Sequence, residues 1–361
     1  MISEGKARVE QGAAFYNPKM AGLRDLSVAF LRAMEIKRYS LLDSTAATGI
    51  RGIRYALESG AGNITMLDIN KSAYLSAKAN AKKNGVKATV LNTSIQEFCN
   101  TEDESFDVID LDPFGSAAPY IYDLMKAAKD NTLLMATATD TAVLCGASPL
   151  ACIKTYGSQP LHNELCHEVG TRILINFVSR IAAQFNFGIE VKIAIANLHY
   201  IRIFLVLHHG ADKAVESIKQ TGFGSFCSKC RAFGYSNGIA PKLDGRCANC
   251  KSETQLFGPL WLGSTYDHAL IRKMKMLMPK NIDRGTSKLV EIIDSELDIP
   301  FFYSIPKLTR RFGIGSVSKK KMIEKLGRKY KVSETHFDTD GIKTDSQIGG
   351  VERAVKSAGS A

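Results

Sequence analysis

The sequence predicts an α/β protein with a mainly parallel sheet and a smaller second domain. Short apolar runs alternate with stretches of helical composition between residues 40 and 138, two β-rich runs follow, and a segment rich in glycine and cysteine begins after residue 210. Strands that alternate with helices at this interval form βαβ units and a parallel sheet. The 361 residues are too many for one ordinary core, so two domains are expected.

Five apolar runs are the expected strands of the parallel sheet, at residues 40–45, 63–69, 88–93, 106–113 and 132–139. Helices are expected at residues 50–58, 71–84 and 117–129, with a longer helix from 161 to about 185 and an N-terminal helix that Asn17-Pro18 opens and that ends near residue 34. Two β-rich runs within residues 188–210 are broken at 197–199, which predicts an antiparallel hairpin that completes the sheet. The first domain is therefore predicted to span residues 1–210.

Residues 211–361 are expected to form the smaller domain, of α+β class. Glycine, cysteine and turn residues crowd its segment 222–250, and helical composition appears at 274–278 and 288–297. The last thirty residues thin out into Gly, Ser, Lys and Asp, and the final SAGSA segment is expected to fray.

Composition limits the class of protein and its partners. Hydrophobic content of 45% and charged content of 23% are ordinary for a soluble globular chain, and no apolar run approaches the roughly 20 residues that span a bilayer. The first ten residues lack the apolar core of a signal peptide, so a cytoplasmic protein is expected. The net charge of +11 favours an anionic partner, nucleic acid first, although basic enzymes without such a partner are common.

Glycines and acids near the first two strands suggest a cofactor loop. Asp43 ends the first strand, and Gly49 and Gly52 then lead into a helix, where a ligand can approach the backbone closely. The loop matches neither G-x-G-x-x-G nor a P-loop. Asp68 ends the second strand, in the place where an acid accepts hydrogen bonds from ribose hydroxyls. The pattern predicts a nucleoside cofactor without phosphates, S-adenosylmethionine being the obvious one; the alternative is a tight turn with Asp68 as a helix cap.

The segment Asp112-Pro113-Phe114-Gly115 follows the fourth strand, where an open α/β sheet places reacting groups. The lone pair of an exocyclic base amine is delocalised, so a carboxylate that accepts its N–H bond and takes its proton favours methylation. We expect Asp112 to act in this way, the Pro113 carbonyl to accept the second N–H bond, and Phe114 to stack on an extruded base. The alternative is a type I or II turn. Asp110 either shares this pocket or caps a loop.

Four cysteines form two close pairs. Cys227 and Cys230, followed after sixteen residues by Cys247 and Cys250, have the spacing of a zinc ribbon, in which four thiolates surround a structural zinc ion. A redox dithiol or plain buried thiols are the alternatives. The other cysteines, which are expected to be small buried thiols, are Cys99, Cys145, Cys152 and Cys166.

A basic segment between residues 307 and 331 holds ten Lys and Arg side chains, with aromatic residues interleaved around it. Such a patch suits contacts with nucleic-acid phosphates. The alternative is a solvated helix face.

At this point the chain resembles the archaeal tRNA (guanine-26-N2)-dimethyltransferases, and the likeness covers nearly its whole length. The sequence motifs shared with this family lie at Glu4-Gly5, 15–18, 24–27, 47–54, 110–115, 139–146, 258–263, 335–337 and 341–345. The resemblance implies a Rossmann-like class I methyltransferase sheet, S-adenosyl-L-methionine as cofactor, and a C-terminal domain that grips tRNA.

The resemblance also implies particular site residues. The implied cofactor contacts are Arg24, Arg51, Asp68, Ile69, Ser94 and Ile95. The implied catalytic residue is Asp112, with Phe114 against the guanine. The sequence departs from the family pattern in two places: Leu23 stands where the family often has Asn, and Ser94-Ile95 stands where it usually has Asp-Ala. Both departures concern the recognition of the cofactor's adenine and not the class of enzyme.

These inferences together predict a tRNA methyltransferase that carries one or two methyl groups from S-adenosyl-L-methionine to N2 of guanine 26, with no obligate protein partner. An N6-adenine RNA or DNA methyltransferase is the nearest alternative, because the same motif chemistry serves either amine. The second alternative is not an enzyme but a non-catalytic zinc-ribbon RNA-binding protein. A dinucleotide oxidoreductase is third, and the missing third glycine counts against it.

Overall fold

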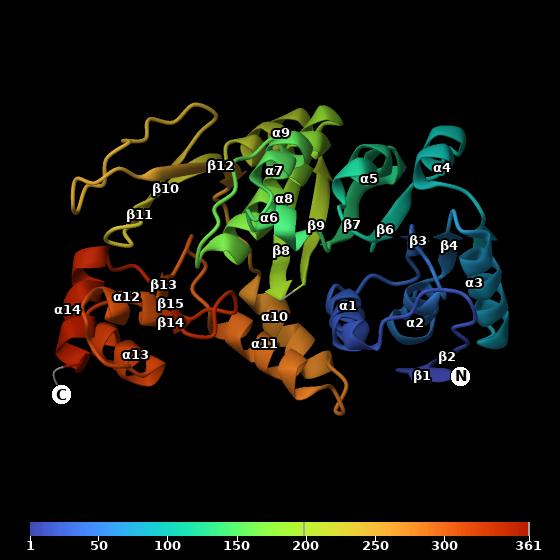
Figure 1. The fold of residues 1–361 in the computed structure, drawn as a ribbon. Helices are drawn as coiled ribbons and strands as arrows, with labels where there is room; N and C mark the ends of the chain where they lie inside the picture. The colour runs from blue at the N-terminus through green and yellow to red at the C-terminus, as the bar shows by residue number, and fades with distance from the viewer. Residues whose placement is uncertain (198, 360–361) are drawn as a thin grey trace.

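The computed structural model describes residues 1–197 and 199–359, and its centre is a seven-stranded sheet of order β5-β4-β3-β6-β7-β9-β8 (Figure 1). The strands are β3 (Ser40–Asp43), β4 (Asn63–Leu67), β5 (Thr89–Leu91), β6 (Phe106–Leu111), β7 (Ala128–Ala138), β8 (Phe187–Asn197) and β9 (Tyr200–His209). The first five pair in parallel, whereas β9 and β8 form an antiparallel hairpin on β7. The predicted parallel sheet with a terminal hairpin is therefore confirmed.

The register of the sheet brings the carboxyl ends of its central strands together. Asp43 of β3 lies beside Met66 of β4 on one side and Asp110 of β6 on the other. The strand order reverses direction at β3, and an open α/β sheet binds its ligands at such a switch point, beyond the carboxyl ends of the strands. The fold thus gathers the loops after β3, β4 and β6 at one edge.

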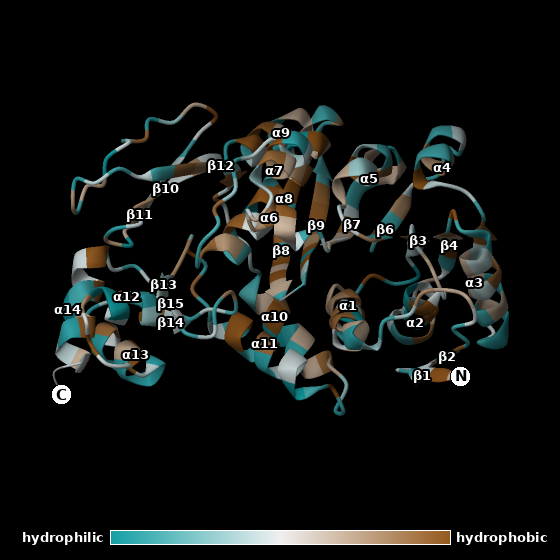
Figure 2. Ribbon diagram, viewed as in Figure 1, coloured by the Kyte–Doolittle hydropathy of each residue, from teal (hydrophilic) through white to brown (hydrophobic). Residues whose placement is uncertain are grey.

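Helices cover both faces of the sheet (Figure 1). One face carries α1 (Ala21–Ala33), α2 (Ile50–Ser59), α3 (Lys71–Lys83) and α10 (His268–Leu277), and the other carries α4 (Ile95–Thr101), α5 (Ala118–Leu124) and α8 (Cys166–Gln184). Successive strand residues point to opposite faces of the sheet. Leu41 therefore packs on the face that carries α1 and α2, and Leu42 on the face that carries α5 and α8. The hairpin strands β9 and β8, at one end of this sheet, are mostly hydrophobic (Figure 2).

Two helices of the sheet region are shorter than the sequence predicts. The helix expected at 117–129 ends at Leu124, and after the turn Met125–Ala127 the strand β7 already begins at Ala128, which pairs with Phe106. The helix expected from 161 begins at Cys166. Composition favours a helix in both places. At residues 128–129 pairing with β6 prevails instead, and at residues 161–165 the chain forms a turn.

The rest of the chain forms small sheets and short helices. The N-terminal hairpin consists of β1 (Ile2–Glu4) and β2 (Ala7–Val9), with a short turn of helix at Pro18–Met20 ahead of α1. Two three-stranded sheets contain β10 (Thr221–Phe226), β11 (Phe233–Asn237) and β12 (Gln255–Trp261), and β13 (Tyr303–Ser304), β14 (Val332–Glu334) and β15 (Gly341–Thr344). The remaining helices are α6 (Thr141–Leu144), α7 (Pro149–Tyr156), α9 (Ala211–Ile218), α11 (Arg284–Ser295), α12 (Ile305–Arg311), α13 (Lys319–Gly327) and α14 (Ile348–Gly359).

The helices expected at 274–278 and 288–297 belong to α10 and α11, which begin earlier because Asp267 and Asp283 cap them. The expectation of a frayed SAGSA segment is wrong for residues 357–359. These residues continue α14, whose Val351, Val355 and Ala358 are buried in the C-terminal core. Residues 360 and 361 lie outside the described residues.

A buried ionic network joins the sheet region to the C-terminal part. Lys343 of β15 lies 3.3 Å from Glu168 of α8 and 3.1 Å from Glu296, and all three side chains are fully buried. Arg172 pairs with Glu168, and the Glu296 carboxylate accepts hydrogen bonds from His336. Buried charges of this kind are stable only when each has its partner, so the network fixes how α8 meets the C-terminal strands.

None of the described helices is long and apolar enough to cross a membrane.

Candidate active site

The loop after β3 is shaped by two glycines. Gly49 has a φ of 76°, in the left-handed region, and a Cβ at this position would lie 3.3 Å from the backbone of Ala77. A Cβ on Gly52 would lie 2.6 Å from the Cε of Met66. Glycine is therefore favoured at position 49 by its backbone conformation and by the close approach of α3, whereas a side chain at position 52 would displace the end of Met66.

Asp43 holds the start of α2. Its side chain is buried, and Oδ2 accepts a hydrogen bond from the backbone N–H of Gly52 at 3.0 Å. Burial, with the nearby charge of Asp110, raises the pKa of Asp43 to about 7. The structure thus places this predicted cofactor residue beneath the glycine loop, where it fixes the loop's path.

Asp68 lies against the same loop from the neighbouring strand. Its Oδ2 accepts a hydrogen bond from the backbone N–H of Ala47 at 2.9 Å, and Oδ1 accepts one from Asn70 at 2.8 Å. The adjacent Ile69 is 75% exposed. A carboxylate beside an exposed apolar side chain is the arrangement that a nucleoside's ribose and base require.

The two residues expected after β5 take local structural roles. Ser94 caps α4 by accepting a hydrogen bond from the backbone N–H of Glu97, and Ile95 is buried in the core. The side chain of Asn92 donates to the backbone carbonyls of Asp68 and Ile69. This segment therefore braces the Asp68 turn.

Asp112 is paired with Arg51 at the carboxyl end of β6. The guanidinium Nε and Nη2 lie 2.8 Å and 2.7 Å from Asp112 Oδ2, while the Asp112 backbone N–H donates to Thr45 Oγ1. Burial raises the pKa of Asp112, but the charges of Arg51 and Arg202 outweigh this effect and leave it below its ordinary value. Its side chain is 23% exposed. Asp112 is thus an ionised acceptor that a substrate can reach.

Asp110 is fully buried and has no route to a substrate. It accepts a hydrogen bond from the hydroxyl of Tyr55 at 2.5 Å and two from Arg202 Nη2 at 2.9 and 3.0 Å. The structure thus shows neither of the two alternatives that the sequence leaves open, because the side chain is buried within the sheet and its partners come from α2 and β9. Sequence reasoning missed Arg202, whose only signal is a charged residue within the apolar run of β9.

Phe114 projects from the turn after β6 and contacts an aromatic ring from the N-terminus. Phe114 is 75% exposed, and its ring centroid lies 4.6 Å from that of Phe15, which is 52% exposed, in an edge-to-face arrangement. Pro113 is buried, and Gly115 exchanges hydrogen bonds with Thr139. Sequence reasoning did not place Phe15 in the site, because nothing local links it to residue 114.

Arg24 holds the N-terminal segment that carries Phe15. Its guanidinium makes two hydrogen bonds to the carboxylate of Glu4, at 2.6 and 2.5 Å, and one to the backbone carbonyl of Asn17. Burial raises the pKa of Glu4, but Arg24 and other partners more than offset it, and the pKa falls to about 2. The structure therefore shows Arg24 as an anchor of residues 4–17, and a contact with a cofactor stays a prediction.

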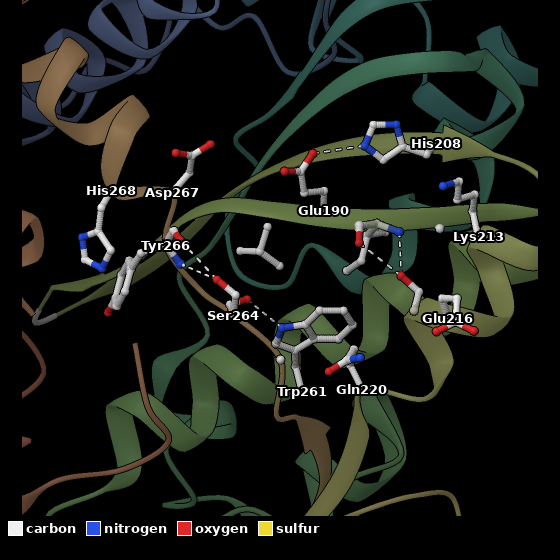
Figure 3. Close-up of a pocket in the computed structure, with 15 residues that line it drawn as sticks. Glu190, His208, Lys213, Glu216, Gln220, Trp261, Ser264, Tyr266, Asp267 and His268 are labelled. Carbon is white, nitrogen blue, oxygen red and sulfur yellow. Dashed lines mark hydrogen bonds and ion pairs between the residues drawn. The ribbon is translucent and has the colours of Figure 1, made fainter. Parts of the chain in front are cut away.

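A cavity of about 640 Å³ lies elsewhere, along the edge strand β8 (Figure 3). Its lining includes Glu190, His208, Lys213, Trp261 and Tyr266. In the strand order, β7 and β9 lie between β6 and β8, so β8 is far from the carboxyl ends of β3, β4 and β6. The cavity is therefore separate from the carboxyl-edge site.

The four paired cysteines converge as the spacing predicts. The Sγ atoms of Cys227 and Cys250 lie 3.4 Å apart, as do those of Cys230 and Cys247, and all four lie within 4.8 Å of one another. The backbone of each pair forms the same knuckle, in which the next residue has positive φ and bonds back to the first cysteine. Four thiolates packed in this way fit a tetrahedral structural zinc ion.

The sheet order, its final antiparallel hairpin and the acids at its carboxyl edge define a class I methyltransferase. A family model described as N2,N2-dimethylguanosine tRNA methyltransferase matches residues 2–356, and the chain belongs to this family.

Named relatives agree with this assignment. The tRNA (guanine(26)-N(2))-dimethyltransferase of Pyrococcus horikoshii is 36% identical and is matched over 96% of this chain and 95% of its own length. That of Thermococcus kodakarensis is 35% identical over 97% and 94%. The solved structure of Trm1 from P. horikoshii in complex with S-adenosyl-L-methionine superposes with a TM-score of 0.90 at 34% identity, covering 98% of each chain.

Proposed function

We propose that this protein transfers methyl groups from S-adenosyl-L-methionine to N2 of guanine 26 in tRNA. The observation that carries the proposal is Asp112, an ionised and reachable carboxylate at the carboxyl end of β6, next to exposed Phe114 and across from the Asp68 loop. The named activity of the relatives supports the same reaction.

The residues around the glycine loop suit the cofactor. Asp68 would accept hydrogen bonds from the ribose and exposed Ile69 would pack on the adenine. Thr48, within the loop, has a buried hydroxyl without a hydrogen-bond partner among the described residues. When bound here, S-adenosyl-L-methionine supplies an electrophilic methyl group on a sulfonium.

Asp112 would accept a hydrogen bond from the exocyclic amine and then its proton. The low pKa of Asp112 is sufficient for this task, because the methylated nitrogen becomes a strong acid once it has formed its new bond. Each transfer replaces one N–H bond of the guanine amine by a methyl group. After two transfers no N–H bond remains for Asp112 or the Pro113 carbonyl to hold, which explains a dimethylated end product.

Phe114 and Phe15 would hold the extruded guanine. Both rings are exposed in the absence of substrate, and a flipped base gains stacking energy on such a platform of about 1–3 kcal/mol. Arg24 and Glu4 fix the segment on which Phe15 is carried.

The C-terminal part would bind the tRNA backbone. Arg310, Lys320, Lys329 and Lys331 are exposed on or next to α12 and α13. The aromatic residues 301–303 of this region are buried, so the patch works through charge rather than stacking. We assign residues 1–210 to methyl transfer and 211–361, with the zinc site, to tRNA binding, and a tRNA substrate implies a cytoplasmic location.

The direct test incubates the protein with labelled cofactor and a tRNA transcript that has guanine at position 26. We expect label in N2-methylguanosine and N2,N2-dimethylguanosine, and none when position 26 is adenine. Label in N6-methyladenosine would support the adenine methyltransferase instead. Failure to bind S-adenosyl-L-methionine by calorimetry would support a non-catalytic RNA-binding protein.

A further inference from the structure

Cys145 and Cys166 lie together beside His167, and methyl transfer leaves all three side chains unused. Their sulfur and ring-nitrogen atoms lie within 4.8 Å of one another. Cys145 is buried, whereas Cys166 and His167 are half-buried. The sequence predicts scattered, small buried thiols, but the fold brings two of them together and leaves one of the two, Cys166, only half-buried.

The surroundings of Cys166 favour its thiolate. Cys166 is the first residue of α8, a helix of 19 residues, so the positive end of the helix dipole lies at its sulfur. A hydrogen bond from Cys145, and the imidazoles of His167 and His162, lower the pKa of Cys166 below the ordinary thiol value. The same hydrogen bond and burial raise the pKa of Cys145, and His167 in turn faces Asp338. Cys166 is therefore the more readily ionised thiol of the pair.

We propose that Cys145 and Cys166 are a redox-sensitive dithiol that hydrogen peroxide converts to a disulfide, with Cys166 as the attacking thiol and Cys145 as the resolving thiol. A reactive, accessible cysteine next to a second thiol is the arrangement found in redox-sensing proteins.

The reaction is balanced with peroxide as the oxidant. The Cys166 thiolate attacks one peroxide oxygen, an S–O bond forms as the O–O bond breaks, and the departing hydroxide takes a proton to become water. The Cys145 sulfur, having lost its proton, then attacks the Cys166 sulfur, and the S–S bond forms as the S–O bond breaks and a second water leaves. Two thiols are oxidised by two electrons, and one peroxide is reduced to two waters.

The disulfide would act on the turn that carries Phe114. Cys145 ends the segment 139–145, whose Thr139 exchanges hydrogen bonds with Gly115. Tyr156 links Asp140 of this segment to Ser116 of the same turn. A disulfide requires an S–S distance of about 2.05 Å, so its closure draws Cys145 toward α8 and displaces these contacts. This consequence for catalysis rests on the proposed function; formation of the disulfide does not.

Zinc is the other occupant that two thiols and an imidazole could hold. The composition of the cluster favours the dithiol, because its described residues offer three ligand atoms and a closed structural zinc site uses four. The zinc ribbon, in contrast, draws four thiols from two separate knuckles. The amount of bound zinc separates the two.

The test treats the full-length zinc-loaded protein with hydrogen peroxide and maps its peptides without reduction. We expect a linked pair of peptides containing Cys145 and Cys166, a fall in methyl transfer of about 10²-fold from the displaced turn, and recovery with dithiothreitol. Cys145→Ser should stop at a Cys166 sulfenic acid that dimedone traps. Cys152→Ser, which removes a buried thiol of the same region, should behave as the wild type.

Three results would overturn the inference. The first is the absence of the linked peptides while the protein remains folded and binds cofactor. The second is a second zinc ion per chain that Cys166→Ser removes. The third is complete linkage with unchanged methyl transfer, which would reject the effect on the turn. A reduced protein that never methylates tRNA would instead reject the proposed function, and the peptide map would still report on the disulfide.

Discussion

The guanidinium of Arg51 lies between two carboxylates of one strand end, 2.7 Å from Asp112 Oδ2 and 3.7 Å from Asp110 Oδ2. One buried cation thus faces two carboxylates at the same end of the sheet. The Asp110 carboxylate is fully buried, and it accepts hydrogen bonds from Tyr55 and Arg202. Asp112, whose side chain is 23% exposed, is therefore the member of the pair that we propose faces the substrate.

Replacement of Asp112 by asparagine should remove catalysis and retain the cofactor site. Asparagine can still accept a hydrogen bond, but it can neither take the proton nor offset the developing positive charge, so methyl transfer should fall by about 10²- to 10⁴-fold. Asp107→Asn is the matched control, because Asp107 lies at the other end of β6 and pairs with Lys129. Single-turnover rates and calorimetry measure the two effects. Lost cofactor binding would reassign Asp112 to the cofactor.

Removal of the Arg51 charge should shift the pH profile. Without the guanidinium, burial is the larger influence on Asp112, and the pKa of its carboxyl rises. Because the ionised form is the active one, the acidic limb of the kcat profile should move to higher pH in Arg51→Met and return in Arg51→Lys. A uniformly lower rate with an unmoved limb, together with weaker cofactor binding, would assign Arg51 to the cofactor instead.

The sequence predicts those features that local chemistry determines. The existence and order of the strands, the position of Asp112 after β6 and the two cysteine knuckles follow from apolar runs, turn residues and ligand spacing, which depend on residues close together in the sequence. The strand bounds differ by one to four residues. Phe15 against Phe114, Arg202 against Asp110 and Cys145 against Cys166 join residues 21 to 99 positions apart, and no local pattern encodes such pairs. Helix ends were misplaced where tertiary pairing overrode composition, as at Ala128.

Loss of zinc should unfold the ribbon before the methyltransferase sheet. The four thiolates tie the β10–β11 turn to the segment before β12, and without the metal they repel one another or carry protons. We expect one zinc ion per chain, lost in Cys247→Ser, with faster amide hydrogen exchange in residues 222–254 and weaker tRNA binding. Cys99→Ser, which removes a buried thiol of the sheet region, should keep the metal. Equal exchange with and without zinc would contradict a structural role.

Lys343 should be the most costly lysine to lose in the C-terminal part. Lys343→Met leaves Glu168 and Glu296 buried without the cation that faces both, and removal of one partner of a buried ion pair costs about 3–5 kcal/mol of unfolding free energy. Lys329→Met, at an exposed position, should change stability by less than about 0.5 kcal/mol. Urea denaturation of both variants measures the difference. Equal midpoints would mean that water reaches the two carboxylates, and that α8 and β15 are joined by apolar packing alone.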